Sequence, residues 1–369
     1  MNTLPSEITS LILVRLPAKS ILQCRCVCKT WLFIIDNPHF AETHLSIVTT
    51  QEHSSTFIFL PTLRHGIYVA QADQDSQIIK SRKVDLSYTE TPFFIFDSYN
   101  GLVCLSSGVH KKNKEIDCFI YICNLCTRLT VCLPLYNSPE CSTATLLLGF
   151  GLDLLSKKYK VVQIFGVING DSYDRQEVQV YTLGSNSWRN IGYAPDFHFI
   201  CGLTAFVSGS CHWLAKDSAG SIIIVSFDLG YEVFGVIPSP EFSLHSDSDS
   251  VRFRIVKLGG RLSIVDCSFD DRIEIWILKE YDMKKKLWIK HLVKKGDVMH
   301  WQRECYPISI SKNGDILLVC DSKKLVYYNT GSEKCTPLEA DGFYGRAHNQ
   351  GTLPSNFGVF SHVESLIPL

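Results

Sequence analysis

The sequence lacks both the long apolar run of a membrane protein and the charge imbalance of a typical nucleic-acid-binding protein. No stretch approaches the roughly 20 consecutive apolar residues that a membrane-spanning helix needs. Lys plus Arg number 36 and Asp plus Glu number 37, so the two signs nearly cancel. A nearly neutral chain has no overall field that would draw it to DNA, RNA or anionic lipid. We therefore expect no membrane and no nucleic-acid partner.

Signals of secretion are also missing. The first twenty residues lack the basic start, the sustained apolar segment and the small-residue cleavage site of a signal peptide. No Asn-x-Ser/Thr glycosylation acceptor occurs, and the 15 cysteines are an odd number. We expect these cysteines to remain thiols in a reducing compartment, which places the protein in the cytoplasm or the nucleus.

Motifs for catalysis, metal binding or cofactor binding are few and incomplete. No GxSxG, HExxH or P-loop motif occurs. The segment GFGLDL (149–154) begins like a glycine-rich phosphate loop, but Leu154 stands where the third glycine would be and a strand-like run follows. His198, His212 and His245 have no neighbour at a ligand spacing. We expect no catalytic residue, no metal and no cofactor.

A helical pattern is present, but only in about the first 45 residues. Apolar residues recur at helical spacing from Leu4 to Leu16, and Pro17 ends this first helix. A second helix is expected to begin near Lys19 and Ser20, and Asn37-Pro38 predicts the start of a further helix that runs to about Leu45. So short a unit cannot bury enough surface to be stable alone. Its apolar faces therefore need another surface, in this chain or in a different protein.

Three cysteines lie close together within this head, in the segment LQCRCVCKTW (22–31). On a continuous helix, Cys24 and Cys28 share one face and Cys26 points to the opposite side, so the three cannot converge on one metal ion. We interpret them as small buried apolar side chains of the core.

The same head resembles the F-box motif in its plant form. The pattern L-P-x-E-I…I-L-x-R-L-P-x-K-S-I-L…C-R-x-V-C-K-x-W is matched without a gap between Leu4 and Trp31, with Cys24 where the plant pattern usually has Phe. The resemblance implies docking onto a Skp-type adaptor, which connects to a cullin scaffold and a RING subunit. The adaptor-binding residues that it implies are Leu4, Pro5, Ile8, Ile12, Leu16, Pro17, Lys19, Ser20, Val27, Cys28, Lys29 and Trp31. We expect truncation of Leu16 or Trp31 to weaken adaptor binding by about 2 kcal/mol or more.

From about residue 46 onward, short β-branched or aromatic runs alternate with turn signals such as Asn100-Gly101 and Gly259-Gly260. Comparable strand–turn–strand units start their turns near Asn124, Thr182, Asp228, Lys279 and Asn329. This spacing is close to the kelch-like period of about 50 residues, with four strands to a blade. The pattern predicts an all-β propeller of about six blades. A strand within GVFSHVESLI (358–367) is expected to join strands at 57–60 and 67–71 and close the ring.

Segments of this body resemble the F-box-associated domain of plant F-box proteins, in the same order along the chain. They are SYNGLVCLSS (98–107), GFGLDLLSKKYKVVQIF (149–165), VQVYTLGSNSWRNI (178–191), GSCHWLAKD (209–217), VSFDLGYEVFGVIPSP (225–240), LGGRLSIVD (258–266), IEIWILKEY (273–281) and SHVESLIPL (361–369). In CNLCTR (123–128), Leu125 replaces the turn proline that the family usually shows. The two cysteines of CNLC lie between strand patterns and lack the helix start of a redox CxxC centre, so we interpret them as part of a turn.

Together these features predict an α+β multidomain chain, with a helical F-box at 1–45 and a substrate-binding, kelch-like propeller at 46–369. The resemblance implies a non-catalytic subunit of a ubiquitin ligase that brings an unknown protein substrate to the charged enzyme. We expect substrate binding on long loops at one propeller face, with loops at 109–117, 168–177, 193–200, 240–250, 294–304 and 340–352 as candidates. Phe343, Tyr344 and Arg346 are the candidate substrate contacts.

Other functions remain open at this point. The chain could be an adaptor-bound scaffold that degrades nothing, or a receptor whose small-molecule ligand fills the propeller mouth. Relatives within the family act in pollen–pistil compatibility and in restraining immune receptors, and the sequence does not choose between these roles. A copper-radical oxidase on a kelch scaffold would need convergent Tyr, Cys and His ligands, which the sequence does not place.

Overall fold

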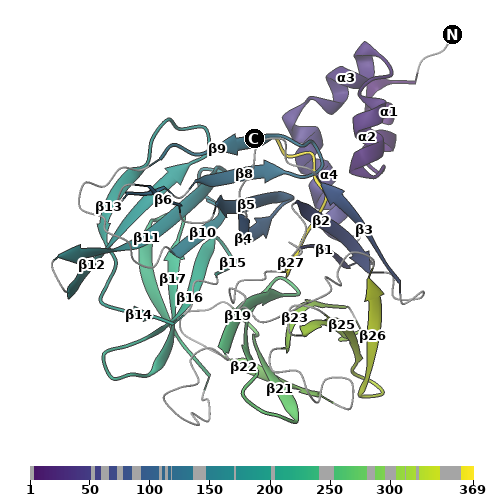
Figure 1. Ribbon diagram of the computed structural model, residues 1–369. Coiled ribbons are helices and arrows are strands. Elements are labelled where there is room, and N and C mark those ends of the chain that lie inside the picture. The colour runs from purple at the N-terminus through teal and green to yellow at the C-terminus, as the bar shows by residue number, and fades with distance from the viewer. Residues whose placement is uncertain are drawn as a thin grey trace.

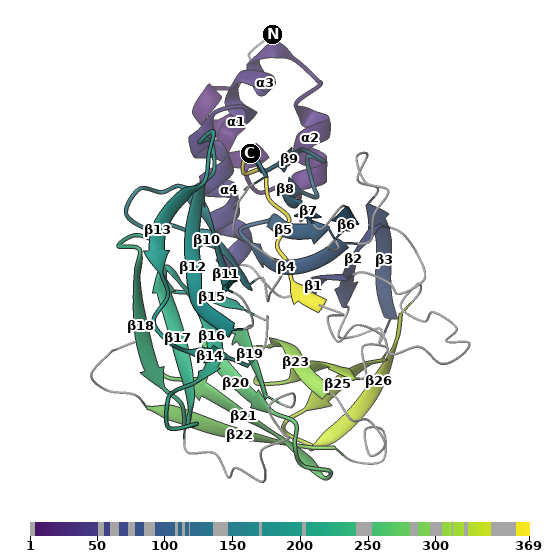
Figure 2. The same ribbon diagram turned by 60° about the vertical axis from the view of Figure 1, so that its left-hand side comes forward.

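The computed structural model shows a small helical head attached to a ring of β-sheets (Figures 1 and 2). It describes residues 4–50, 55–59, 66–72, 78–84, 93–107, 110–112, 115–117, 119–135, 147–169, 172–200, 204–240, 253–280, 287–295, 305–311, 313–320, 324–340 and 359–369. None of the described helices has the length and hydropathy of a segment that crosses a bilayer.

The head contains the helices α1 (Ser6–Leu13), α2 (Ala18–Cys24), α3 (Lys29–Ile35) and α4 (Pro38–Thr50). A break between two helices lies near Pro17 as expected, but α1 already ends at Leu13, and Pro17 is the residue directly before α2. The side-chain Oδ1 of Asn37 accepts a hydrogen bond from the backbone N–H of His39 at 2.9 Å, which is the predicted N-cap. Helix α4 extends five residues beyond the expected end near Leu45.

The interpretation of the three head cysteines is wrong for two of them. Helix α2 ends at Cys24, and α3 begins only at Lys29, so no continuous helix carries the cysteines. Cys24 is half-buried and packs against the core, but Cys26 and Cys28 are exposed. The turn between the helices directs their thiols outward, which periodicity alone could not show.

The body is a six-bladed propeller, which confirms the predicted architecture. Blade 1 combines both parts of the chain, because the late strand β27 (Val359–Ser361) pairs with β1 (Ser55–Phe59), which is followed by β2 (Ile67–Ala72) and β3 (Ile78–Val84). This pairing confirms the predicted closure of the ring. Blade 2 contains β4 (Phe93–Tyr99), β5 (Leu102–Ser107), β8 (Ile120–Asn124) and β9 (Thr130–Cys132), and the hairpin β6 (His110–Lys112) and β7 (Glu115–Asp117) lies between β5 and β8.

The remaining blades follow in sequence order. Blade 3 contains β10 (Leu147–Leu152), β11 (Tyr159–Asn169), β12 (Ser172–Thr182) and β13 (Arg189–Tyr193). Blade 4 contains β14 (His198–Phe199), β15 (Ala205–Val207), β16 (Ser210–Lys216), β17 (Ile222–Asp228) and β18 (Val233–Pro238). Blade 5 contains β19 (Phe253–Leu258), β20 (Arg261–Asp266), β21 (Arg272–Leu278) and β22 (Trp288–Lys294), and blade 6 contains β23 (Cys305–Ile310), β24 (Ile316–Cys320), β25 (Lys324–Asn329) and β26 (Lys334–Ala340). Strand β26 pairs in parallel with β3, which joins blade 6 to blade 1.

The predicted turn starts lie at one structural position. In blades 2, 3 and 6, the third strand ends at Asn124, Thr182 and Asn329, and in blade 5 it ends one residue before Lys279. In blade 4 the short strands β14 and β15 both pair with β16 and together count as the first strand, so the third strand is β17, which ends at Asp228. The tight turns Asn100-Gly101 and Gly259-Gly260 have positive φ at both residues and connect the first two strands of blades 2 and 5. Such turns match the twist of antiparallel hairpins.

Two opposite faces of the propeller follow from the alternating strand directions. The first and third strands of each blade end on the face where β1 begins, which we call the head face. The connections after the second and fourth strands begin and end at the other face, which we call the distal face. The hydroxyl of Ser365 donates to the backbone oxygen of Asn100 at 2.6 Å, so the C-terminal segment lies on the head face.

One cysteine pair departs from the expectation of free thiols. Cys305 and Cys320 are register partners on β23 and β24 and form a disulfide. The expectation is therefore wrong for this pair, because the antiparallel register places the two side chains directly opposite each other.

Candidate functional site: the apolar head surface and the propeller faces

The head exposes seven large apolar side chains among its described residues. They come from α1, from α3 and from the segments before and between these helices, and they are Leu4, Ile8, Leu11, Ile12, Val27, Leu32 and Phe33. We call this set the apolar head surface. Phe33 is 79% exposed and Val27 is 63% exposed, which is unusual for residues of this size. A group of this kind on a soluble domain marks an interaction site.

The other side of each helix is buried, which fixes the orientation of the apolar head surface. Leu13, Val14, Ile21, Ile35 and Phe40 are at most 6% exposed and belong to one core cluster with residues of blades 2 and 3. The helices therefore cannot rotate to hide their outer apolar residues without exposing these inner ones. Helix α1 is apolar on both sides. One side packs in the core, and the other side stays exposed.

An ion pair holds the connection between α2 and α3. Nε of Arg25 lies 2.5 Å from Oδ1 of Asp36, and Nη2 lies 2.9 Å from Oδ2, so the contact is bidentate. The hydrogen bond from Arg25 lowers the pKa of Asp36. This pair ties the end of α2 to the end of α3 and so fixes the turn that carries Val27.

The structure separates the predicted adaptor-binding residues into two groups. Nine are exposed and available for contact, namely Leu4, Pro5, Ile8, Ile12, Pro17, Lys19, Val27, Cys28 and Lys29. Leu16, Ser20 and Trp31 are half-buried, and Leu16 and Trp31 pack against the core cluster. The backbone oxygen of Leu16 also accepts a hydrogen bond from Nε2 of His44 at 3.1 Å. Truncation of Leu16 or Trp31 would therefore disturb the fold of the head as well as any contact.

Leu11, Leu32 and Phe33 belong to the apolar head surface but were not among the predicted adaptor-binding residues. Leu11 was part of the apolar stripe but not of the motif match. The signal for Phe33 was its position beside Trp31, Ile34 and Ile35, because the buried stripe leaves residue 33 on the opposite side of α3. A large aromatic residue outside the core stripe indicates a contact surface.

The glycines of GFGLDL serve packing between blades. A Cβ at Gly149 would lie 2.7 Å from Sγ of Cys211, and a Cβ at Gly151 would lie 2.2 Å from ring carbons of Phe206. Both neighbours belong to blade 4, so the glycines allow β10 to approach the next blade. The strand-like run predicted after these glycines forms β11, which confirms that prediction.

The CNLC segment forms the predicted turn between β8 and β9. Oδ1 of Asn124 accepts hydrogen bonds from the backbone N–H groups of Cys126 and Thr127 at 2.9 and 3.1 Å. Burial raises the pKa of Cys123 to about 12 and that of Cys126 to about 11, so both remain thiols at neutral pH. Nδ2 of Asn124 donates to the backbone oxygens of Ser365 and Ile367, which binds the C-terminal segment to blade 2.

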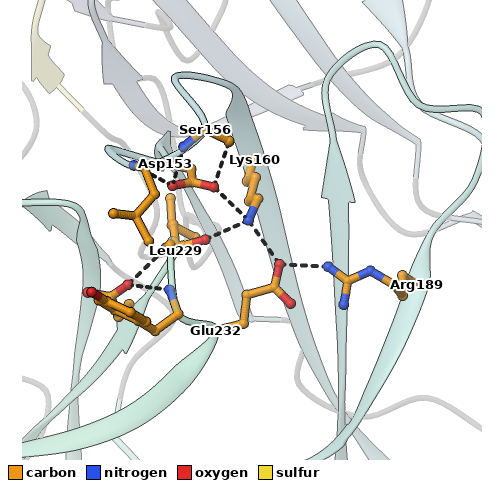
Figure 3. A network of polar contacts seen from close by, with 10 residues as sticks. Asp153, Ser156, Lys160, Arg189, Leu229 and Glu232 are labelled. Carbon is orange, nitrogen blue, oxygen red and sulfur yellow. Dashed lines mark hydrogen bonds and ion pairs between the residues drawn. The ribbon is translucent and has the colours of Figure 1, made fainter.

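A buried network of ion pairs joins blades 3 and 4 at the head face (Figure 3). Nζ of Lys160 lies 2.9 Å from both Oδ2 of Asp153 and Oε1 of Glu232, and it donates to the backbone oxygen of Leu229 at 2.7 Å. Arg189 contacts the same Glu232 oxygen at 2.6 Å.

Burial alone would raise the pKa of the Asp153 carboxyl in this network, but hydrogen bonds from Ser156 and Lys160 outweigh that effect and hold it well below its usual range. Burial also opposes the charge of Lys160, yet its two carboxylate partners raise its pKa. All four side chains are thus charged and paired. We interpret this network as a structural link between blades.

The candidate substrate loops share one location. The predicted loop at 168–177 is wrong, because β11 runs to Asn169 and β12 begins at Ser172, so the two strands continue through most of it. The predicted loops at 109–117 and 193–200 contain the short strands β6, β7 and β14. All six segments lie where a second or a fourth strand ends, so the strands that flank them end at the distal face. Phe343, Tyr344 and Arg346 lie outside the described residues. Within the described part of the chain, no group of three or more His, Cys, Asp or Glu residues is arranged to hold a metal ion.

Comparison with known proteins gives consistent matches over the whole chain. Residues 45–362 match the family described as F-box associated beta propeller domain, and residues 1–43 match the F-box domain. The chain is similar to three Arabidopsis thaliana proteins. F-box protein CPR1 is 28% identical over 92% of this chain and 84% of its own length. F-box protein At3g07870 is 26% identical, with 89% and 85% covered, and F-box protein At5g65850 is 31% identical, with 78% and 70% covered.

Proposed function

The chain belongs to the F-box proteins that carry an F-box-associated β-propeller domain, and from this premise we propose that it is the substrate-recognition subunit of a Skp–cullin–F-box ubiquitin ligase. In this function the head binds a Skp-type adaptor, and the adaptor connects it to the cullin scaffold and the RING subunit. The propeller binds a protein substrate for ubiquitination and degradation. We propose that the protein works in the cytoplasm or nucleus.

The mechanism is positioning, without a catalytic residue in this chain. A substrate held on the propeller presents its lysines to the ubiquitin-charged enzyme at a high effective concentration. The buried carboxylates and lysine described above are already neutralised by one another and serve the fold.

The apolar head surface is the observation that carries this proposal. Seven large apolar residues stay exposed on the head while the opposite sides of its helices are packed in the core. A few anchors of this kind usually supply most of the energy of an interface. Their arrangement on a rigid helical unit suits a protein partner, as the F-box family implies.

The two proposed partners, adaptor and substrate, would bind at separate surfaces of the molecule. The head attaches at the head face, whereas the candidate substrate loops connect strands that end at the distal face. A substrate at the distal face would leave the apolar head surface free, so both partners could be bound together.

A capture experiment tests adaptor binding. The full chain is co-expressed with a Skp-type adaptor beside Ile12→Asp and Phe33→Asp, with Leu287→Asp as the matched control, since Leu287 is an exposed apolar residue of blade 5. We expect Ile12→Asp and Phe33→Asp to reduce adaptor capture more than tenfold, because a charge at an apolar contact must lose its water. The control should capture the adaptor normally. Full capture by both folded head variants would overturn the proposal.

The same experiment, done with a proteasome inhibitor, addresses the substrate. Proteins that accumulate with the intact chain and with the head variants are candidate substrates, and their turnover is then measured in cells. Slower turnover of such a protein when Phe33→Asp replaces the intact chain supports degradation. Unchanged turnover with intact adaptor binding would instead support a scaffold that does not degrade its partner.

A further inference from the structure

A cavity of about 80 Å³ lies at the centre of the propeller. Its walls come from β4, β15, β19, β23 and β27, which are inner strands of five different blades. This volume is well below the roughly 300 Å³ at which pockets for larger organic ligands begin. A water molecule occupies about 30 Å³ in the liquid, so the cavity suits a few waters or one small ion.

Two basic side chains of β19, Arg254 and Lys257, line this cavity, and both are half-buried. Nζ of Lys257 lies 4.9 Å from the ring centroid of Tyr99 in blade 2, which is the blade opposite to its own. Cζ of Arg254 lies 4.3 Å from the ring centroid of Tyr306. The ammonium group of Lys257 has no hydrogen bond or ion pair with another described residue. It has therefore lost part of its hydration without gaining an acceptor.

One acidic side chain, Asp97 of β4, lines the same cavity. Its Oδ1 accepts a hydrogen bond from the backbone N–H of Ser98 at 2.7 Å, and no direct ion pair joins it to Lys257, although the structure describes both residues. Burial raises the pKa of Asp97 to about 7, and the charge of Lys257 opposes this shift. The described lining thus combines two cations with a carboxyl that is about half protonated at neutral pH, which leaves the cavity positive.

We propose that this central cavity binds one small oxyanion of the carboxylate or sulfate type. Lys257 donates a hydrogen bond to the anion, Arg254 adds a second positive charge, and the carboxyl of Asp97 is protonated when the anion is bound. A neutral molecule of the same size would leave the two positive charges uncompensated. This inference goes beyond the proposed ligase function and does not depend on it.

The protonation of Asp97 makes anion binding depend on pH. The charged and titratable groups around this carboxyl are Arg254, Lys257, Tyr306, Tyr99, Cys211 and His362. Burial raises the pKa of Tyr99 and of Cys211 and lowers that of His362 to about 3, so none of these three changes its charge between pH 6 and pH 8. As the pH falls through this range, Asp97 loses its negative charge, and anion binding should become tighter.

Fluorine NMR of trifluoroacetate tests the site, because this ion stays charged throughout the pH range and reports its own binding. It is titrated into the full chain at pH 6 and at pH 8 with constant ionic strength, beside trifluoroacetamide, which has a similar shape and no charge. Lys257→Met removes one cation. Lys290→Met is the matched control, since Lys290 also lies in blade 5 above an aromatic ring, 4.8 Å from the centroid of Trp276. Asp97→Asn removes the acid and keeps an acceptor for the N–H of Ser98.

We expect saturable binding of trifluoroacetate that sulfate displaces and that is at least about threefold tighter at pH 6 than at pH 8. Lys257→Met should weaken it about tenfold, because a hydrogen bond from a charged group is lost, and Lys290→Met should leave it unchanged. Asp97→Asn should tighten binding at pH 8 and remove the pH dependence, a gain that an unfolded variant could not show. Melting curves establish that each variant is folded.

Four outcomes would overturn the proposal. They are the absence of saturable binding, equal binding of trifluoroacetamide, an equal loss in the two lysine variants, and weaker binding by folded Asp97→Asn than by the unmodified chain at pH 8.

Discussion

At Gly151, the absence of a side chain allows blades 3 and 4 to approach each other closely. The nearest atoms to a Cβ at this position would be the ring carbons of Phe206, which is itself 2% exposed. The Phe206 ring also packs edge-on against Tyr99 of blade 2, with 4.6 Å between the ring centroids. The ring therefore lies between Gly151 and Tyr99.

We expect Gly151→Ala to lower the free energy of unfolding by about 1 to 3 kcal/mol, which is the usual cost of overfilling a packed core. Gly331→Ala is the matched control, because its Cβ would meet nothing closer than 3.6 Å. Urea unfolding of both variants and the unmodified chain measures the difference. Equal stability of the two variants would show that the blades separate easily at this point.

The buried ring of His362 makes the stability of the fold depend on pH. Burial and Arg82 lower its folded-state pKa to about 3, against 6.5 for an exposed histidine. Between these values the unfolded chain binds a proton that the folded chain does not. Stability from this group is thus fully present above about pH 6.5 and is lost as the pH falls toward 3, with a limiting slope of about 1.4 kcal/mol per pH unit.

We expect His362→Asn to flatten the loss of unfolding free energy between pH 6.5 and pH 4, measured by urea unfolding at several pH values. All other titratable groups are the same in His362→Asn and in the unmodified chain. His212, whose pKa burial lowers to about 4, adds a similar slope. Asp97 acts in the opposite direction, because burial raises its pKa to about 7. Identical slopes in the two proteins would show that His362 is not buried in solution.

At the scale of the elements, the ion-pair network ties two neighbouring blades together by their hairpins. Lys160 is the second residue of β11 in blade 3, and Glu232 lies in the hairpin before β18 in blade 4. Side chains of Lys160 and Asp153 are 9% and 3% exposed, whereas that of Arg189 is 56% exposed. Removing the lysine would leave two carboxylates facing each other with little access to water.

We expect Lys160→Met to lower the free energy of unfolding by about 3 kcal/mol, the range found when one partner of a buried pair is removed. Arg189→Met should cost less than about 1 kcal/mol, because solvent screens an exposed pair. Chemical unfolding of both variants at pH 7 compares them. A smaller loss for Lys160→Met than for Arg189→Met would contradict the structural role assigned to the network.

The elements differ in how far the sequence predicts them. The blades follow from local chemistry, because the turn after each third strand is marked by residues such as Asn124, Asp228 and Asn329 that bond to their own backbone. The turn at Cys26 could not be predicted in this way, since nothing in its residue types stops a helix. The contacts of Asn124 with Ser365 and Ile367 join residues more than 240 positions apart, and no local sequence pattern predicts such a pairing.

The candidate site shows the same distinction. The motif match named four of the seven residues of the apolar head surface, but it could not separate exposed residues from Leu16 and Trp31, which pack against the core. Exposure depends on how the head packs against the C-terminal segment and the blades.

At the scale of the whole molecule, the C-terminal segment 362–369 connects the head with the propeller. Leu366 and Ile367 are each 8% exposed and belong to the same core cluster as Ile21 and Phe40 of the head and Leu102 of blade 2. Asn124 fixes the backbone of this segment by two hydrogen bonds. The segment therefore packs against both the head and the propeller.

We expect the double variant Leu366→Ala with Ile367→Ala to loosen the head from the propeller, because each truncation of a buried aliphatic side chain removes about 2 to 5 kcal/mol. Limited proteolysis should then cut within the first 50 residues while the blades stay resistant, and calorimetry should show a separate transition of the head at lower temperature. Val363→Ala, at a half-buried position of the same segment, is the control and should behave like the unmodified chain. A single unshifted transition in the double variant would mean that the head is held by the blades themselves, without the help of the C-terminal segment.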